Sequence, residues 1–285
     1  MRKQFIPLLF FFCANTLSGQ MATKVMTFNI RYDNPVDGEY GWKRRLPLVK
    51  EVMQQEQPDI IGLQEVLNNQ AEDLQKVLPG YKWSGVGRDD GKEKGEYAPI
   101  FFRSSRFEMK EGSTFWLSEI PEVPGSRSWN AACTRIVTWV KLNDKKSKHV
   151  FFVFNTHFDH ASQSAREQSA KLLLLKITEI AGTSAVILTG DFNDTLNSIP
   201  VRTLTSGPAA LENTLNLSSS SPEGPDYSFA GFPFHPEKGD VIDFIFLRNK
   251  GGITVTRHSI ITFHKEDKYP SDHLPVCVEL EFPTP

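Results

Sequence analysis

Cysteine is scarce in this sequence, which has only three among its 285 residues. Cys133 and Cys277 lie in apolar runs that resemble strands, where a cysteine is usually a small buried hydrophobic residue. A disulfide between them would be compatible with an oxidising compartment, but nothing in the sequence indicates one. The third, Cys13, follows Phe11 and Phe12, where small residues would normally precede a lipidated cysteine. Lipid anchoring at Cys13 is therefore disfavoured.

Long hydrophobic runs are also missing. A transmembrane helix needs about 20 consecutive apolar residues, and the apolar run at residues 5–13 is far shorter. Because this run follows Arg2 and Lys3 and precedes small or polar residues, it has the order of a signal peptide. We predict that residues 1–20 are a signal peptide and that residues 21–285 form one domain. The protein would then be exported, either periplasmic or secreted, with no transmembrane segment.

Excess positive charge is absent as well. The formal net charge is −2, and it becomes −4 (−2 − 2) when Arg2 and Lys3 are removed. The compact basic run at residues 145–148 lies between two strand-like segments and is typical of a solvated hairpin tip. These features exclude a protein that holds nucleic acid through bulk charge. Any phosphate must be bound at a local site, and no obligate protein partner is evident.

Short apolar runs rich in β-branched and aromatic residues predict the strands. Residues at helical spacing predict helices near 46–53 and 71–78, and a longer one after His160 with Ser164 and Glu167 as its capping box. Strand follows strand between about residues 100 and 154, which argues against a wholly parallel sheet. We predict an α/β fold with two mixed sheets packed face to face. The predicted strands are 24–30, 60–63, 100–102, 135–142, 150–154, 185–188, 241–247 and 274–280.

Polar side chains stand at the ends of these apolar strands, where a sheet edge presents them together. Any one of them has a structural explanation, because an Asp after a strand is commonly a helix cap and an Asn often occupies a turn. Their joint order and type are more specific than any single member. The set is Asn29, Glu65, Glu96, His157, Asp191, Asn193, Asp243, Asp272 and His273.

This joint pattern resembles the endonuclease/exonuclease/phosphatase superfamily, and it is closest in form to the deadenylase-like branch. The resemblance covers essentially the whole chain after residue 20. It implies a DNase I-like fold, a four-layer α/β sandwich of two mixed β-sheets flanked by helices, and a metal-dependent phosphoesterase. The matching segments are Thr27-Phe28-Asn29, Leu63-Gln64-Glu65, Asn155-Thr156-His157, Gly190-Asp191-Phe192-Asn193, Ile242-Asp243-Phe244-Ile245 and Ser271-Asp272-His273.

The resemblance also implies a metal site. Glu65 would be the principal ligand of Mg²⁺, with Asn29 and Asp272 completing or supporting the site. A shell made only of oxygen atoms suits Mg²⁺, and also Mn²⁺. Arg31 departs from the Asn-x-Asp or Asn-x-Glu pattern of some relatives, and we expect it to contact the substrate phosphate or to pair with Asp33.

The catalytic roles follow from the same resemblance. His157 and His273 would flank the scissile phosphate, with Glu96 orienting His157 and Asp243 orienting His273. Such pairing would raise the pKa of each imidazole.

In the same family, Asp191 would activate or orient the attacking water, unless a histidine is the base. Asn193 would hold the phosphate or the Asp191 side chain.

Two other functional classes compete with this interpretation. Asn155 to His160 matches the zinc-binding His-x-His-x-Asp-His pattern of metallo-β-lactamases except at its first residue, with Asp159 and His160 otherwise explained as polar residues that lead into the next helix. The other class is a binding module that kept the fold and lost the reaction. Every matching position still bears a chemically competent side chain, which argues against such a module.

The substrate is the open question within the enzyme class. We predict a phosphodiesterase or nuclease that cleaves RNA or DNA from the 3′ end. The alternative is a phosphatase or phosphodiesterase of nucleotide, lipid or sugar phosphates, of the inositol phosphate or sphingomyelinase type. Aromatic and basic residues that could stack bases and hold phosphates favour nucleic acid. The alternative is that Trp42 anchors a helix and that residues 43–45 are solvated. The residues concerned are Trp42 to Arg45, Trp129 and Lys265 to Tyr269.

Overall fold

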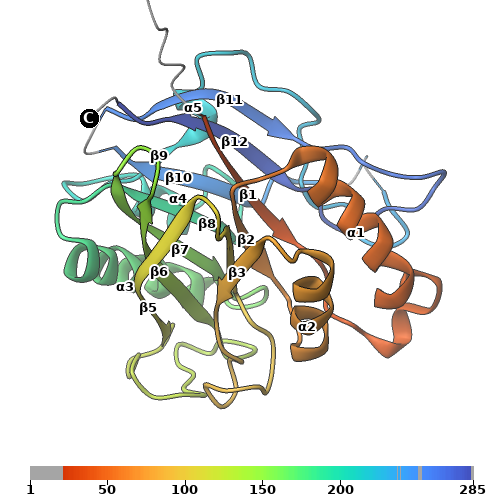
Figure 1. Ribbon diagram of the computed structural model, residues 1–285. Coiled ribbons are helices and arrows are strands. Elements are labelled where there is room, and N and C mark those ends of the chain that lie inside the picture. Colours follow the sequence, from red (N-terminus) through yellow and green to blue (C-terminus); the bar gives the residue numbers. More distant parts are fainter. Residues whose placement is uncertain (1–21, 236, 238, 250–251, 284–285) are drawn as a thin grey trace, which may run out of the picture.

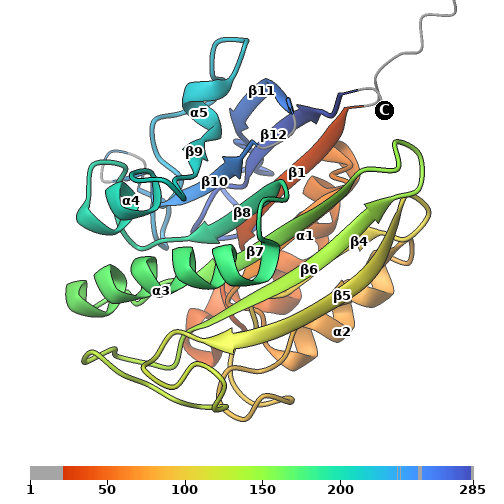
Figure 2. The same cartoon turned by 90° about the vertical axis from the view of Figure 1, so that its left-hand side faces the viewer.

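The computed structural model describes residues 22–235, 237, 239–249 and 252–283, and in it two six-stranded sheets pack face to face (Figures 1 and 2). The predicted signal peptide and Cys13 lie outside the described residues. The first sheet has the strand order β11-β12-β1-β2-β4-β3, and the second has the order β5-β6-β7-β8-β10-β9. Both sheets are mixed, and the predicted α/β sandwich is confirmed. No described helix is long and apolar enough to cross a membrane.

The first sheet is built around a parallel pair, β1 and β2, in which Asn29 lies beside Gln64. Antiparallel neighbours flank this pair on both sides, β12 next to β1 and β4 next to β2. The strands are β1 (Thr23–Asn29), β2 (Ile60–Gln64), β3 (Tyr81–Ser84), β4 (Ile100–Arg103), β11 (Thr254–Ile260) and β12 (Val276–Glu281).

The second sheet has its own parallel pair, β7 and β8, which places His157 directly beside Asp191. Strand β10 runs antiparallel to β8 and begins at Asp243, opposite Asp191. Register therefore aligns three predicted site residues along one edge of this sheet. The strands are β5 (Phe107–Trp116), β6 (Ile136–Asp144), β7 (Val150–His157), β8 (Val186–Asp191), β9 (Glu212–Asn213) and β10 (Asp243–Arg248).

Helices cover the outer face of each sheet, as the views in Figures 1 and 2 show. The apolar faces of α1 and α2 pack on the first sheet, and those of α3 and α4 pack on the second. Helix α3 is capped by Ser162, which accepts a hydrogen bond from the amide of Ala165, so the predicted capping box at Ser164 is wrong. The helices are η1 (Pro35–Tyr40), α1 (Trp42–Glu56), α2 (Asn68–Val77), α3 (Gln163–Ala181), α4 (Ile199–Leu204) and α5 (Thr214–Leu217).

The space between the sheets is apolar over most of its area but becomes polar toward the strand ends. Gln64 of the first sheet donates to Asn155 Oδ1 of the second at 2.7 Å, and Thr189 Oγ1 donates to the same oxygen at 3.0 Å. The Asn155 amide donates in turn to the carbonyl of Leu63 at 2.7 Å. All of these side chains are fully buried. Because each hydrogen bond joins specific partners, this network fixes how the two sheets lie against each other.

Gly62 makes the close approach of the sheets possible. A Cβ atom at this position would lie 2.1 Å from Thr189 Oγ1 and 2.6 Å from Asn155 Oδ1, distances that real side chains do not tolerate. Glycine is therefore required here by lack of space.

Candidate active site

The predicted site residues converge at the edge where β1, β2, β7 and β8 end. All except the buried Asn29 and Asp243 line a cleft with a volume of about 520 Å³, which Arg88 and Arg135 also line. The first sheet supplies Asn29 and Glu65, while the second supplies His157 and Asp191. Asp272 and His273 come from the segment just before β12. Glu65, Asp191 and Asp272 gather around Asn29 and Arg31, whereas Arg88 and Arg135 carry positive charge near His157.

The carboxylates are organised around Asn29, which is fully buried. Its amide nitrogen donates to Glu65 Oε1 at 3.0 Å and to Asp191 Oδ2 at 2.9 Å. Its amide oxygen accepts from the backbone of Arg31 at 3.0 Å. Asn29 thus joins carboxylates of the two sheets and supports them as a donor. Glu65 has a φ of +58°, a left-handed conformation that a non-glycine residue adopts when its surroundings impose it.

Arg31 lies against this carboxylate group. Its guanidinium donates two hydrogen bonds to Asp37 at 3.1 Å, and so the predicted pairing with Asp33 is wrong. The remaining nitrogen, Nη1, lies 3.9 Å from Glu65 Oε2 and 4.0 Å from Asp272 Oδ2. Two carboxylates therefore lie near the same guanidinium nitrogen of Arg31.

A divalent cation fits this donor set. Glu65 and Asp272 offer only oxygen atoms, which hard cations such as Mg²⁺ and Mn²⁺ prefer. Burial, together with the charge of Glu65, raises the pKa of Asp272 in the metal-free protein, although His273 and Arg31 oppose this effect. A bound cation would relieve the repulsion between the two carboxylates.

His273 forms the predicted pair with Asp243. Its Nδ1 lies 2.9 Å from Asp243 Oδ2, which also accepts from Ser228 Oγ at 2.7 Å. Burial alone would lower the pKa of His273, but Asp243, Asp191 and Asp272 outweigh it and raise the pKa to about 10. His273 is therefore an imidazolium at neutral pH.

His157 has a different environment from the one predicted. Glu96 Oε2 lies 4.0 Å from His157 Nδ1, too far for a hydrogen bond, and instead accepts from Arg88 Nη1 at 2.7 Å. Burial, followed by the positive charges of Arg135 and Arg88, lowers the pKa of His157 well below its ordinary value. The predicted direct pairing with Glu96 and the predicted rise in pKa are both wrong for this histidine.

Asp191 lies between the two histidines. Its Oδ2 is 3.4 Å from His157 Nε2 and 3.8 Å from His273 Nε2. Burial, and then the charge of Asp243, raise the pKa of Asp191 to about 7. Asp191, Asp243 and His273 also form one of the described groups whose ligand atoms lie within 4.8 Å of one another.

Asn193 completes this centre, with a φ of +48° and its side chain beside His157. Its amide nitrogen lies 2.9 Å from His157 Nε2 and donates to the carbonyl of Phe158 at 3.0 Å. Its backbone amide donates to Asp191 Oδ1 at 2.9 Å. Asn193 therefore links Asp191 to His157, as a residue that holds the Asp191 side chain would.

Arg45 is the residue that sequence reasoning placed wrongly. It is 2% exposed rather than solvated. Its guanidinium donates to five backbone carbonyls, among them Arg31 at 2.9 Å and Pro270 at 3.1 Å, with Ile30, Tyr32 and Tyr40 as the others. Burial lowers the pKa of Arg45 to about 10, so the side chain stays charged at neutral pH. Arg45 thereby ties the segment after Asn29 to the segment before Asp272, and no sequence motif indicated this role.

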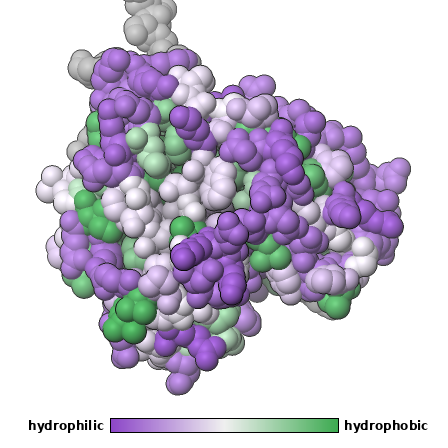
Figure 3. Space-filling model, turned by 60° about the horizontal axis from the view of Figure 1, so that its bottom comes forward, coloured by the Kyte–Doolittle hydropathy of each residue, from purple (hydrophilic) through white to green (hydrophobic). Residues whose placement is uncertain are grey.

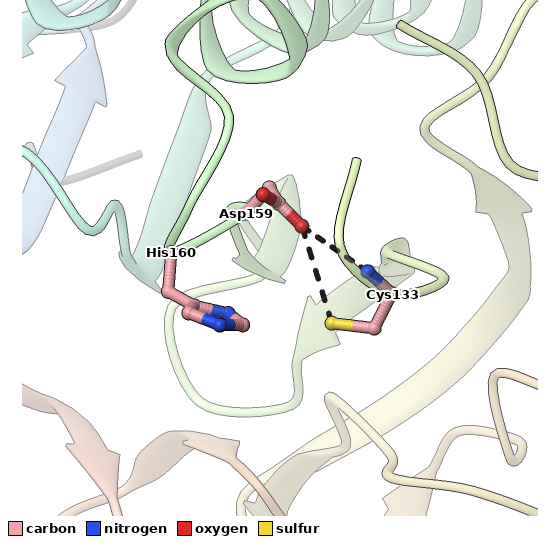
Figure 4. A group of neighbouring side chains, drawn as sticks. All are labelled: Cys133, Asp159 and His160. Atoms are coloured by element: carbon pink, nitrogen blue, oxygen red, sulfur yellow. Dashed lines mark hydrogen bonds between the residues drawn. The ribbon is translucent and has the colours of Figure 1, made fainter. Parts of the chain in front are cut away.

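The predicted zinc alternative does not fit the geometry. Asp159 and His160 group with Cys133 rather than with His157, and the three side chains point toward one another at the edge of the cleft (Figure 4). Asp159 is occupied by backbone amides, since it accepts from Ala132 at 2.8 Å and from Ser162 at 2.8 Å. We predicted that Asp159 is a polar residue that leads into the next helix, and the hydrogen bond that it accepts from the amide of Ser162, the N-cap of α3, confirms this prediction.

A cation also crowds this group. Arg135 Nη2 lies 3.0 Å from His160 Nδ1, which must accept because a guanidinium can only donate. Burial raises the pKa of the Cys133 thiol, which opposes formation of a thiolate ligand. Cys133 lies before β6 and lines the cleft, so its predicted place inside a strand is wrong. Cys277 is buried in β12, as predicted. Both cysteines are free thiols.

Comparison with known proteins identifies the family. Residues 26–273 match the model of the endonuclease/exonuclease/phosphatase family. The chain belongs to this family. Its members are metal-dependent phosphoester hydrolases, and the resemblance predicted from the motifs is confirmed.

Three solved structures illustrate the range of relatives. An endonuclease/exonuclease/phosphatase from Bacteroides vulgatus is 40% identical, with a TM-score of 0.88 over 92% of this chain and 100% of that one. The mannosyl-6-phosphatase of Bacteroides thetaiotaomicron is 33% identical, with a TM-score of 0.82 over 91% of this chain and 100% of that one. The catalytic domain of human Nocturnin is 21% identical, with a TM-score of 0.72 over 92% and 94%, and shares the fold.

Proposed function

We propose that this family member is an exported, Mg²⁺-dependent phosphomonoesterase that acts on a small polar phosphate ester such as a sugar phosphate. The observation that carries the proposal is the character of the cleft. Its volume of about 520 Å³ is in the range of small-molecule sites. Among the described residues, Tyr32 and Phe229 are its only aromatic lining, and Phe229 packs on His273 with ring centroids 4.8 Å apart.

Two of the aromatic residues that favoured nucleic acid, Trp42 and Tyr269, have structural partners. Trp42 is 1% exposed, and its indole donates to Asp73 at 3.1 Å. Tyr269 stacks on Phe234 with ring centroids 3.7 Å apart. A side chain that is already packed offers no free face for a base. The 33% identity with a mannosyl-6-phosphatase points in the same direction.

The surface supports a polar substrate over a lipid aggregate. On the face turned forward in Figure 3, hydrophilic residues predominate and hydrophobic ones form small separate patches. Binding at a lipid surface generally uses a larger continuous apolar area. Export is supported by the predicted signal peptide at residues 1–20.

The residues of the site divide the reaction as follows. Asp191 orients a water molecule and accepts its proton as the water oxygen bonds to phosphorus. The bond from phosphorus to the leaving oxygen breaks, and His273 donates a proton to that oxygen. Arg31 holds a phosphoryl oxygen, and Asn193 holds the Asp191 and His157 side chains in place. A divalent ion at Glu65 and Asp272, when bound, neutralises charge on the phosphoryl group.

An activity panel tests this proposal. The purified protein would be assayed with Mg²⁺, Mn²⁺ or EDTA on hexose 6-phosphates, p-nitrophenyl phosphate, its bis-ester, and single-stranded RNA and DNA. We expect monoesters to be hydrolysed faster than diesters, activity to vanish in EDTA, and Glu65→Gln to remove the activity. Faster cleavage of the bis-ester or of nucleic acid would replace the proposal with a 3′-end nuclease. That alternative has in its favour the arginines that could hold a second phosphate.

A further inference from the structure

A small cavity lies behind His157. It has a volume of about 10 Å³, and its lining includes Arg88, Glu96, Arg135 and His157. This volume is close to the space that one water molecule requires. A buried water also needs two to four polar partners, and the cavity offers charged groups of both signs.

Four side-chain nitrogen atoms of the residues that line the cavity have no hydrogen-bond partner among the described residues. They are Arg88 Nε, Arg135 Nε, Arg135 Nη1 and His157 Nδ1, all shielded from bulk solvent. The arginines are held by their other nitrogens, Arg88 Nη1 by Glu96 at 2.7 Å and Arg135 Nη2 by His160 at 3.0 Å. Asp159 Oδ2 is 3.8 Å from Arg135 Nε, too far for a hydrogen bond. A buried donor without a partner costs about 1–3 kcal/mol, and one water in the cavity could accept from two of these atoms.

The hydrogen bonds of Asn193 indicate which nitrogen of His157 carries its proton. The Asn193 amide donates to the carbonyl of Phe158 at 3.0 Å, and this contact identifies the nitrogen end of the amide. The same Nδ2 lies 2.9 Å from His157 Nε2 and has a second hydrogen to donate. Nε2 therefore accepts, and in the neutral ring the proton is on Nδ1, which faces the cavity.

We propose that one ordered water in this cavity accepts hydrogen bonds from His157 Nδ1 and Arg135 and donates to Glu96, and that Arg135 is thereby a positioning residue for His157. The water accounts for the separation of 4.0 Å between Nδ1 and Glu96 Oε2, which is the distance of a bridged contact. Together with the Asn193 amide, the water favours the tautomer with the proton on Nδ1, in which the lone pair of Nε2 accepts from Asn193. In this tautomer His157 is a neutral hydrogen-bond acceptor at Nε2, whereas His273 is the proton donor of the proposed reaction. This inference deepens the proposed function of the same site.

The first test measures the tautomer directly. In ¹⁵N NMR spectra of the metal-free protein at neutral pH, we expect His157 to show a protonated Nδ1 and an unprotonated Nε2. In Arg135→Met we expect a mixture of tautomers, and in Arg135→Lys partial recovery. Arg103→Met is the matched control, since Arg103 is bound to the carbonyl of Pro58 and does not line the cleft. A protonated Nε2 in the wild type, or an unchanged tautomer in Arg135→Met, would overturn the proposal.

Two further measurements keep the proposal testable if Arg135→Met does not fold. Glu96→Gln should also mix the tautomers, and a high-resolution crystal structure should show one water within hydrogen-bonding distance of Glu96 and His157. A dry cavity would refute the inference. Because neither measurement needs a substrate, failure here with monoesterase activity intact would leave the proposed function standing. The reverse result would reject that function and keep the positioning role.

Discussion

The two histidines of the cleft lie on either side of Asp191 but have opposite electrostatic surroundings. His273 is enclosed by carboxylates and bonds directly to Asp243, which holds it as a cation. His157 is enclosed by Arg88 and Arg135, which together with burial keep it neutral. In the proposed reaction the same residue type is therefore a proton donor on one side of the site and a neutral hydrogen-bond acceptor on the other. The neighbouring charges, and not the histidines themselves, set this division.

The largest expected effect comes from removing either imidazole. We expect His157→Ala and His273→Ala each to lower kcat by about 10²–10⁴-fold, the usual contribution of a placed acid or base. His149→Ala is the control, because His149 precedes the same strand that His157 ends. Steady-state kinetics with the best substrate of the activity panel would measure this fall in kcat. Near-normal rates in both site variants would remove the histidines from the mechanism.

A smaller effect, a change in histidine pKa, distinguishes the surroundings of His273 from those of His157. Asp243→Asn should lower the pKa of His273 by about 1–3 units, because an opposite charge in contact with the imidazole is lost. Glu96→Gln should leave His157 neutral across the same pH range, since burial and the arginines dominate there. NMR titration of the metal-free protein would follow both rings. If the pKa of His273 does not move in Asp243→Asn, the contrast drawn between the two sites is wrong.

The smallest effect concerns a buried histidine with no charged partner. Burial lowers the pKa of His258 to about 4, while the Thr214 hydroxyl lies 3.1 Å from its Nδ1. Because the unfolded chain binds a proton near pH 6.5 and the folded chain does not, stability falls as the pH drops through this range. We expect a loss of roughly 2 kcal/mol between pH 7 and pH 5.

Urea denaturation of the wild type and of His258→Gln would measure this loss. The variant should lose less stability over the same interval, because it has no imidazole to protonate at this position. Equal losses in the two proteins would assign the pH dependence to other groups.

Much of the fold was predictable because its central strands are continuous apolar runs. The edge strands β3, β5 and β11 were not predicted. β5 is mostly exposed, and β3 and β11 are buried over only part of their length, so none forms such a run. The types and order of the site residues were predictable because a strand end places a polar side chain at the sheet edge. The hydrogen-bond and ion-pair partners of these residues were not predictable, because they depend on how the side chains pack.

Arg45 and Glu96 show why some partners escaped prediction. Arg45 follows Lys43 and Arg44 in a sequence typical of a solvated helix start, yet one of the carbonyls it binds belongs to Pro270, 225 positions further along the chain. Glu96 was assigned to His157 by resemblance, but Arg88, eight positions away, bonds to its carboxylate instead. Charge balance in a buried space depends on every neighbour at once, and a motif records only a few of them.

Gly62 should tolerate few substitutions, although it contributes no chemical group to the site. Because a single methyl group there would press on Thr189 and Asn155, Gly62→Ala would move apart the sheet that holds Glu65 and the sheet that holds Asp191. In a saturation mutagenesis screen that records activity alone, Gly62 should tolerate as few substitutions as the residues that touch the phosphate. A scan of this kind would mark as essential a position that never meets the substrate, and stability measurements would be needed to separate the two causes.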